Sequence, residues 1–129
     1  MQTDERRTQL NEITEKIIGC CYAVSNSLGI GFLEKVYENA LAIEFEKAGL
    51  RFSTQVPIPV KYEGQLVGDF VADMLVAESV LVELKAVRAL EEAHLAQCMN
   101  YLRATGLPLC LLVNFGTPHV HVRRIVNQF

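Results

Sequence analysis

The stretch VLVELKAV, residues 80–87, constrains the fold more than any other part of the sequence. Six of its eight residues are apolar, which predicts a buried or half-buried β-strand. Glu83 and Lys85 nevertheless lie in its middle, and side chains two apart on a strand share one face. Burying either charge without a partner is unfavourable, and an apolar replacement would usually be no less stable. Taken alone, an E-x-K pattern is usually a solvated ion pair, but here its neighbours on the strand are apolar.

The hydrophobic periodicity changes along the chain from helical to extended and back. Spacings of three to four predict helices over residues 5–28 and about 33–48, whereas residues 53–87 predict three strands. A helix over residues 90–106 and strands over residues 107–116 and 119–126 follow. This order predicts an α/β fold, in which a mixed central sheet is flanked by helices.

Turn and proline positions refine this arrangement. Turns are expected at Glu63-Gly64 and around Glu78. Pro57 and Pro59 cannot donate ladder hydrogen bonds, so their strand is expected at an edge of the sheet.

A turn centred on Glu78 places two acids opposite each other. In that register Asp73 faces Glu83, and directly opposed residues have Cβ atoms about 5 Å apart. Two facing carboxylates repel, and a divalent metal with oxygen ligands would explain the pair. Asp69, four residues earlier on the same face, is the alternative ligand if the register differs.

Length and composition bound the class of protein. The 129 residues predict one domain, residues 1–129, and the absence of a secretory signal or a long apolar run predicts a cytoplasmic protein without a membrane partner. The cysteines lack CxxC spacing, which favours reduced, buried thiols at Cys20, Cys21, Cys98 and Cys110. A net charge of −3 argues against binding nucleic acid by bulk electrostatics, although bound metal ions could supply positive charge.

Four motifs together resemble a known group of enzymes: Asp73, Glu83-x-Lys85, GFLEKVY and QCMNY. Asp73 followed by Glu83-x-Lys85 resembles the PD-(D/E)xK nuclease superfamily, although Ala72 stands where the motif has proline, a residue that carries no chemistry. GFLEKVY, residues 31–37, is similar to the signature of the GxxExxY proteins, and QCMNY, residues 97–101, resembles the QxxxY motif of RecB-type nucleases. The resemblance covers roughly residues 10–126 and implies a restriction-endonuclease-like core.

The resemblance also implies roles for individual residues. Asp73, Glu83 and a backbone carbonyl near Leu84 would hold Mg²⁺ or Mn²⁺, and Glu34 would reach the metal directly or through water. Lys85 would contact the attacking water or the scissile phosphate. Two residues four apart on a helix, Gln97 and Tyr101, would orient this lysine and the DNA backbone.

Other polar residues are less specific. Tyr37 is expected to be a packing residue whose hydroxyl satisfies a neighbour, and His94 either binds phosphate or does not take part. His119 and His121 share a predicted strand face but lack a third ligand, so we expect exposed residues. The arginines would line a groove for a phosphate backbone or, by default, are solvated: Arg88, Arg103, Arg123 and Arg124.

The sequence thus predicts a metal-dependent nuclease, a hydrolase of phosphodiester bonds in DNA, with RNA as the lesser possibility. The alternative is a catalytically silent nuclease fold that binds or assembles with a partner protein. A third interpretation is a structural protein with a surface ion-pair cluster. Small size and acidic balance predict weak DNA affinity alone, and therefore a homodimer or a larger complex.

Overall fold

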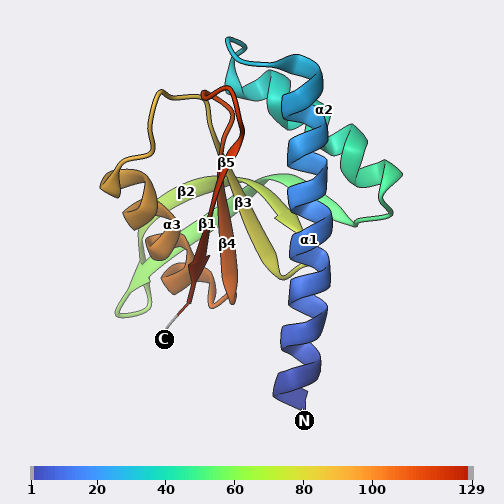
Figure 1. Cartoon of the computed structure of the whole chain (residues 1–129). Helices are drawn as coiled ribbons and strands as arrows, with labels where there is room; N and C mark the ends of the chain where they lie inside the picture. Colours follow the sequence, from blue (N-terminus) through green and yellow to red (C-terminus); the bar gives the residue numbers. More distant parts are fainter. Residues whose placement is uncertain (1, 128–129) are drawn as a thin grey trace.

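A five-stranded sheet with helices on both faces forms the protein, in a computed structural model that describes residues 2–127 (Figure 1). The strands follow one another across the sheet in chain order. They are β1 (Phe52–Tyr62), β2 (Gln65–Val76), β3 (Val80–Lys85), β4 (Leu109–Asn114) and β5 (His121–Val126). The helices are α1 (Gln2–Leu28), α2 (Glu34–Lys47) and α3 (Glu92–Thr105). The predicted order of elements is confirmed, and so is the mixed sheet flanked by helices.

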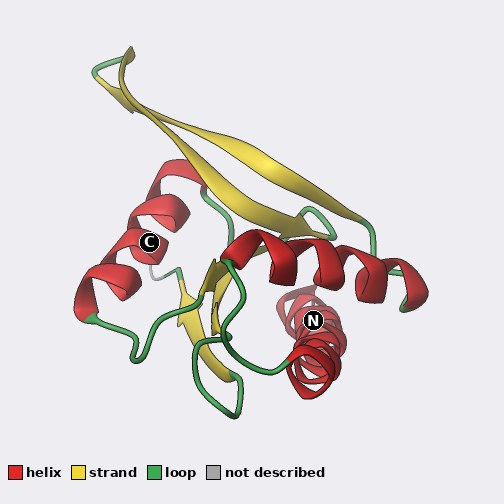
Figure 2. Ribbon diagram, turned by 90° about the horizontal axis from the view of Figure 1, so that it is seen from above, coloured by secondary structure: helices red, strands yellow, loops and turns green. Residues whose placement is uncertain are grey.

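A long antiparallel hairpin of β1 and β2 projects beyond the helices (Figure 2). Its turn is the predicted pair Glu63 and Gly64, whose φ angles of 50° and 80° suit a two-residue hairpin connection. β1 lies at the edge of the sheet, as Pro57 and Pro59 predicted. The hairpin therefore presents a long surface on the side of the sheet where α3 packs against β1.

The only parallel pair of strands in residues 2–127 joins β3 to β4, and α3 makes the crossover that such a pair requires. The backbone N–H of Glu91 donates to Nδ1 of His94 over 3.0 Å at the start of α3. The helix ends at Gly106, which takes the left-handed conformation with φ of 74°. His94 thus caps a helix. No helix of the described residues is long and apolar enough to cross a membrane.

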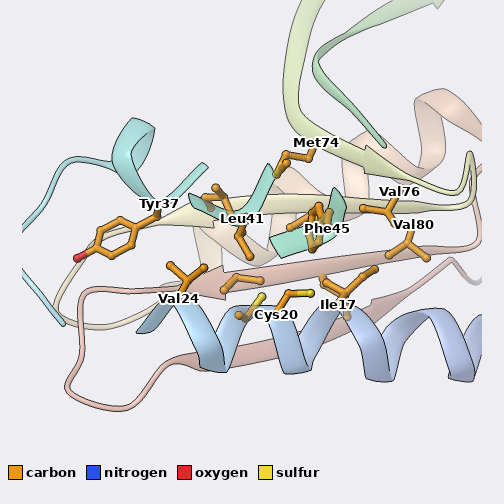
Figure 3. Packing of buried hydrophobic residues seen from close by; sticks show 14 of the residues in the cluster. Ile17, Cys20, Val24, Tyr37, Leu41, Phe45, Met74, Val76 and Val80 are labelled. Atoms are coloured by element: carbon orange, nitrogen blue, oxygen red, sulfur yellow. The ribbon is translucent and has the colours of Figure 1, made fainter. Parts of the chain in front are cut away.

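Two hydrophobic clusters fill the two faces of the sheet. On one face, α1 and α2 cover the sheet with residues such as Ile17, Leu41 and Phe45 (Figure 3). On the other face, α3 contributes Cys98 and Leu102 to a smaller cluster. All four cysteines are buried and free, as predicted.

Strand β3 is shared between these clusters. Val80, Val82 and Leu84 pack in the cluster beneath α1 and α2. Leu81 packs in the cluster beneath α3, so the alternation of side chains directs Glu83 and Lys85 toward α3.

Candidate active site

The acids Asp73 and Glu83 join β2 to β3 where the regular pairing of the two strands ends. The strands pair from Val76↔Val80 to Met74↔Val82, which is the register predicted from a turn at Glu78. Beyond this point the backbone N–H of Asp73 donates to Oε1 of Glu83 over 2.8 Å. The N–H of Leu84 donates to Oδ2 of Asp73, also over 2.8 Å. Each carboxylate is therefore held by a backbone N–H of the opposite strand.

Burial and mutual repulsion make this acid pair hard to ionise. Glu83 is only 3% exposed, and burial followed by the charge of Asp73 raises its pKa to about 7. The backbone N–H of Asp73 and the charge of Lys85 oppose that rise. Burial likewise raises the pKa of Asp73, against the hydrogen bond from Leu84. A cation beside the pair would favour its doubly ionised form.

The donor set suits a hard divalent cation. Glu83 uses Oε1 and Asp73 uses Oδ2 for the backbone hydrogen bonds, which leaves one oxygen of each carboxylate. No three His, Cys, Asp or Glu side chains of the described residues gather closely enough to hold a metal by themselves. Mg²⁺ is nevertheless commonly bound through one or two carboxylates, with waters and substrate phosphates completing the octahedron. The residues present therefore fit such an ion.

Lys85 connects the acid pair to α3. Its Nζ donates to Oε1 of Gln97 over 3.3 Å, and Nε2 of Gln97 donates to the hydroxyl of Tyr101 over 3.1 Å. Because an ammonium group can only donate, the first bond fixes the Gln97 amide with its oxygen toward the lysine, and the amide nitrogen then faces Tyr101. The predicted common face of Gln97 and Tyr101 is confirmed, and the chain Lys85–Gln97–Tyr101 restricts where the ammonium can lie.

Glu34 is the first residue of α2 and lies within electrostatic reach of the pair. Its side chain is exposed, yet partial burial of the carboxyl raises its pKa, which Lys85 lowers and Asp73 raises further. Glu34 is thus an exposed acid that interacts electrostatically with Asp73, Glu83 and Lys85.

Tyr37, the last residue of the GFLEKVY segment, is buried beneath the loop that precedes α2. It is fully buried and stacks on Phe115, with ring centroids 4.5 Å apart. Its hydroxyl donates to the carbonyl of Gly29 over 2.7 Å and accepts the N–H of Phe32 at 3.4 Å. The predicted packing role is confirmed: Tyr37 holds the loop from which α2, and with it Glu34, begins.

Comparison with known families identifies the fold. Residues 11–125 match the model of the PD-(D/E)XK nuclease superfamily. The chain belongs to this superfamily. No curated protein sequence matches it.

One solved structure supports the same mixed α/β fold, and a second shows a weaker likeness. The chain is similar to the crystal structure of SSO0001, with 19% identity and a TM-score of 0.57 over 96% of this chain and 62% of that one. It is also similar to an alkaline exonuclease (LHK-Exo) from Laribacter hongkongensis, with 16% identity and a TM-score of 0.49 over 73% of this chain and 56% of that one. The chain therefore spans less than two thirds of either protein.

Around this PD-(D/E)XK core, the structure adds a buried acid that the sequence did not single out. Glu38 is 4% exposed, and its carboxylate accepts Nζ of Lys35 at 2.7 Å and Nε2 of Gln55 at 2.8 Å. Its charge raises the pKa of Asp73. Glu38 lies four residues after Glu34, so a shared helix face was the available signal.

Gln55 itself occupies an unusual place in β1. Its neighbours Thr54 and Val56 pair with Met74 and Ala72, so Gln55 lies across from Asp73. It has a φ of 52°, which few residues other than glycine adopt without strain. The hydrogen bond between Gln55 and Glu38 thus links α2 to the part of β1 that lies across from Asp73.

Asn114 is a second polar residue that the sequence did not single out. It is fully buried, pairs with Lys85 in the β3–β4 register, and accepts the N–H of Val87 at 3.0 Å while donating to its carbonyl over 2.9 Å. A Cβ at Gly116 would lie 2.1 Å from that carbonyl oxygen. Asn114 and the close approach of Gly116 therefore hold the backbone that follows Lys85 in place. A lone Asn ending an apolar strand was the available signal.

Several other candidates are not among the hydrogen-bond partners described above for the acid pair. Asp69 is exposed and pairs with Pro59 in the hairpin, so it is not the alternative ligand. His119 and His121 are exposed, as expected, but only His121 belongs to β5, so the predicted common strand face is wrong. The arginines are all exposed: Arg88 follows β3, Arg103 is on α3, and Arg123 and Arg124 are on β5.

Proposed function

We propose that the protein is a metal-dependent nuclease that hydrolyses phosphodiester bonds of DNA. The observation that carries the proposal is the crossed pair of acids, half-buried Asp73 and buried Glu83, with Lys85 on the same strand face as Glu83. An acid pair whose pKa values are raised by burial weakens a fold unless something neutralises it. Membership of the PD-(D/E)XK nuclease superfamily supports the same chemistry.

Mg²⁺ or Mn²⁺ would be held by the remaining oxygens of Asp73 and Glu83, with the carbonyl of Leu84 and Glu34 as further ligands. Such an ion, when bound, neutralises charge on the phosphate and lowers the pKa of a bound water. The hydrogen bonds from the backbone of Asp73 and Leu84 orient the two carboxylates before any ion arrives. Because this orientation is set by main-chain atoms, it changes little as the reaction proceeds.

Lys85 would bind the attacking water or a phosphate oxygen and stabilise the negative charge that develops there. Water would form the new P–O bond, the bond to the leaving oxygen would break, and that oxygen would take up a proton. Gln97 would position the ammonium group through its Oε1, and Tyr101 would hold the Gln97 amide in the required orientation. Both are positioning residues in this scheme.

Cleavage of supercoiled, linear and single-stranded DNA with Mg²⁺ or Mn²⁺ tests the proposal. Wild type should cleave, and Lys85→Ala, purified identically, should be about 100- to 1,000-fold slower, as expected for a lost charge-stabilising group. Lys47→Ala is the matched control, because Lys47 forms a surface ion pair with Glu44 over 3.1 Å. Equal cleavage by wild type and Lys85→Ala would indicate a contaminating nuclease and contradict the assignment.

We also propose that the chain is a GxxExxY protein. Two positions support this proposal. Glu34 is the first residue of α2, and Tyr37, about one turn later, bonds to the loop that precedes the helix. If no DNA is cleaved, the alternative is a silent nuclease fold that works with a partner.

A further inference from the structure

A groove runs between the β1–β2 hairpin and α3. Its volume is about 1020 Å³, at the upper end of the range of roughly 300–1,000 Å³ usual for ligand pockets. Pro59, Val60 and Phe70 line the hairpin side. Small alanines, among them Ala93 and Ala96, line the helix side. The walls are thus mostly apolar and leave open space between them.

The groove meets the candidate active site at two residues. Gln97 and Tyr101 line it, and the same two side chains carry the hydrogen bonds that lead to Lys85. A molecule in the groove would therefore lie against the residues that position the catalytic lysine.

Phe70 offers an aromatic surface inside the groove. Its side chain is 48% exposed, and its ring centroid lies 6.1 Å from that of Tyr101 at an angle of 47°. Gly68 makes room for the ring, because a Cβ there would lie 3.1 Å from it. Exposing half of a large aromatic side chain is unfavourable in water, and its open face suits a planar ligand.

The charge of the groove differs from that of the chain. Lys61 and Arg103 line it, and no Asp or Glu does so among the described residues. The whole chain, by contrast, has a net charge of −3. Positively charged side chains beside an aromatic ring suit a ligand that has both a planar ring and negative charge.

We propose that this groove binds unpaired nucleotides of a single-stranded nucleic acid, with a base stacked on Phe70 and flanking phosphates near Lys61 and Arg103. A duplex hides its base faces and would offer the aromatic ring nothing to stack on, whereas single strands expose them. The inference rests on the proposed nuclease function and names the form of its substrate: a single strand or a frayed end.

Binding measured without catalysis tests the inference separately from the nuclease function. Fluorescence anisotropy in EDTA would compare labelled oligo(dT) and oligo(rU) of about 12 nucleotides, within the usual site sizes of roughly 4–16, with a blunt duplex. Wild type should prefer single strands, and the two oligonucleotides distinguish DNA from RNA. Phe70→Leu should weaken single-strand binding about 5- to 150-fold, because stacking contributes roughly 1–3 kcal/mol per base.

Matched variants separate stacking from damage to the fold. Phe70→Tyr should retain binding, since it keeps the ring. Tyr22→Leu should also retain binding, because Tyr22 is an equally exposed aromatic, 48%, on α1 across the sheet. Lys61→Gln should lower the slope of log K against log salt by about 0.7. Circular dichroism would establish that each variant is folded.

The outcomes are distinguishable. Binding that depends on Phe70 without cleavage by wild type would support the groove and contradict the nuclease. Cleavage by wild type with unchanged binding in Phe70→Leu would do the reverse. A preference for the duplex, or no binding at all, would overturn the inference. So would a wild-type dimer that Phe70→Leu dissociates, since the occupant would then be a second copy of the chain.

Discussion

The two faces of strand β3 differ in what their side chains do. The face of Val80, Val82 and Leu84 is sealed beneath α1 and α2 in a continuous apolar cluster. The opposite face begins with buried Leu81 but continues with Glu83 and Lys85, beside an open groove. Adjacent residues of one strand therefore belong to a closed core and to a polar site.

This difference shows why the charges of β3 can be tolerated. The sealed face supplies hydrophobic stabilisation and fixes the strand, so the other face can hold groups that weaken the fold. The carboxylates are oriented by main-chain N–H groups of Asp73 and Leu84, which belong to the rigid sheet. Changes on the two faces should therefore have separable effects, on stability for one and on activity for the other.

The largest expected effect contrasts Asp73→Asn with Leu111→Ala. Asp73→Asn keeps an acceptor for the N–H of Leu84 but should slow cleavage by roughly 1,000-fold or more, because metal-assisted charge stabilisation is worth several kcal/mol. Leu111 pairs with Val82 and is fully buried on the sealed face. Its truncation should lower the free energy of unfolding by about 2–5 kcal/mol.

Cleavage rates and urea unfolding, measured on both variants well below their melting temperatures, check this contrast. Leu111→Ala should cleave at close to the wild-type rate while folded. A large loss of stability in Asp73→Asn with no specific loss of activity would contradict the separation of the two faces.

A second, smaller effect is the pH dependence of the metal-free protein. Glu83 has a pKa of about 7 when folded, against an ordinary value of 4.5, so the folded state binds more protons between these values. Its contribution to stability is fully present below the ordinary value and is lost as pH rises through about 7. Wild type should lose on the order of 2–3 kcal/mol from this group between about pH 5 and pH 8.

Urea unfolding in EDTA at both pH values measures this loss, with Glu83→Gln as the comparison. The variant keeps an acceptor for the N–H of Asp73 and has no charge to bury, so its stability should change less with pH. Parallel pH dependence in the two proteins would show that Glu83 is not the group responsible.

The smallest effect concerns the residues that position Lys85. Gln97→Ala removes the acceptor at 3.3 Å and should lower kcat about tenfold, whereas Tyr101→Phe removes one neutral hydrogen bond and should lower it about fivefold. Because Tyr101 acts through Gln97, the double variant should be no slower than Gln97→Ala alone. Steady-state kinetics on all three variants would show whether the effects are coupled. Additive losses would mean that the two residues act independently.

The sequence predicted the elements and the acid pair because their signals are local. Hydrophobic periodicity marked the helices and strands, and the turn at Glu78 fixed the register of β2 and β3, beyond which Asp73 and Glu83 meet through a hydrogen bond. Inferences from periodicity and register need only spacing along one segment of the chain. The resemblance of GFLEKVY to the GxxExxY signature, by contrast, implied that Glu34 reaches the site.

Features that depend on distant segments were not predicted. Glu38 gains its importance from Gln55, and the position of Gln55 follows from the pairing of β1 with β2. Asn114 bonds to the backbone of Val87 because β4 pairs with β3 in parallel, and local spacing in the sequence does not reveal that pairing. The groove likewise joins Phe70 on β2 to Tyr101 on α3, so its existence follows only from the packing of the hairpin against that helix.

The central claim, that Asp73 and Glu83 hold a divalent metal, is tested most directly by thermal unfolding with and without Mn²⁺ near pH 8. Glu83, whose pKa is raised to about 7, is then largely ionised. A ligand that binds only the folded state raises the midpoint of thermal unfolding. The account predicts that Mn²⁺ raises the melting temperature of wild type and leaves that of Asp73→Asn unchanged. An equal rise in both proteins, or no rise in wild type, would contradict it.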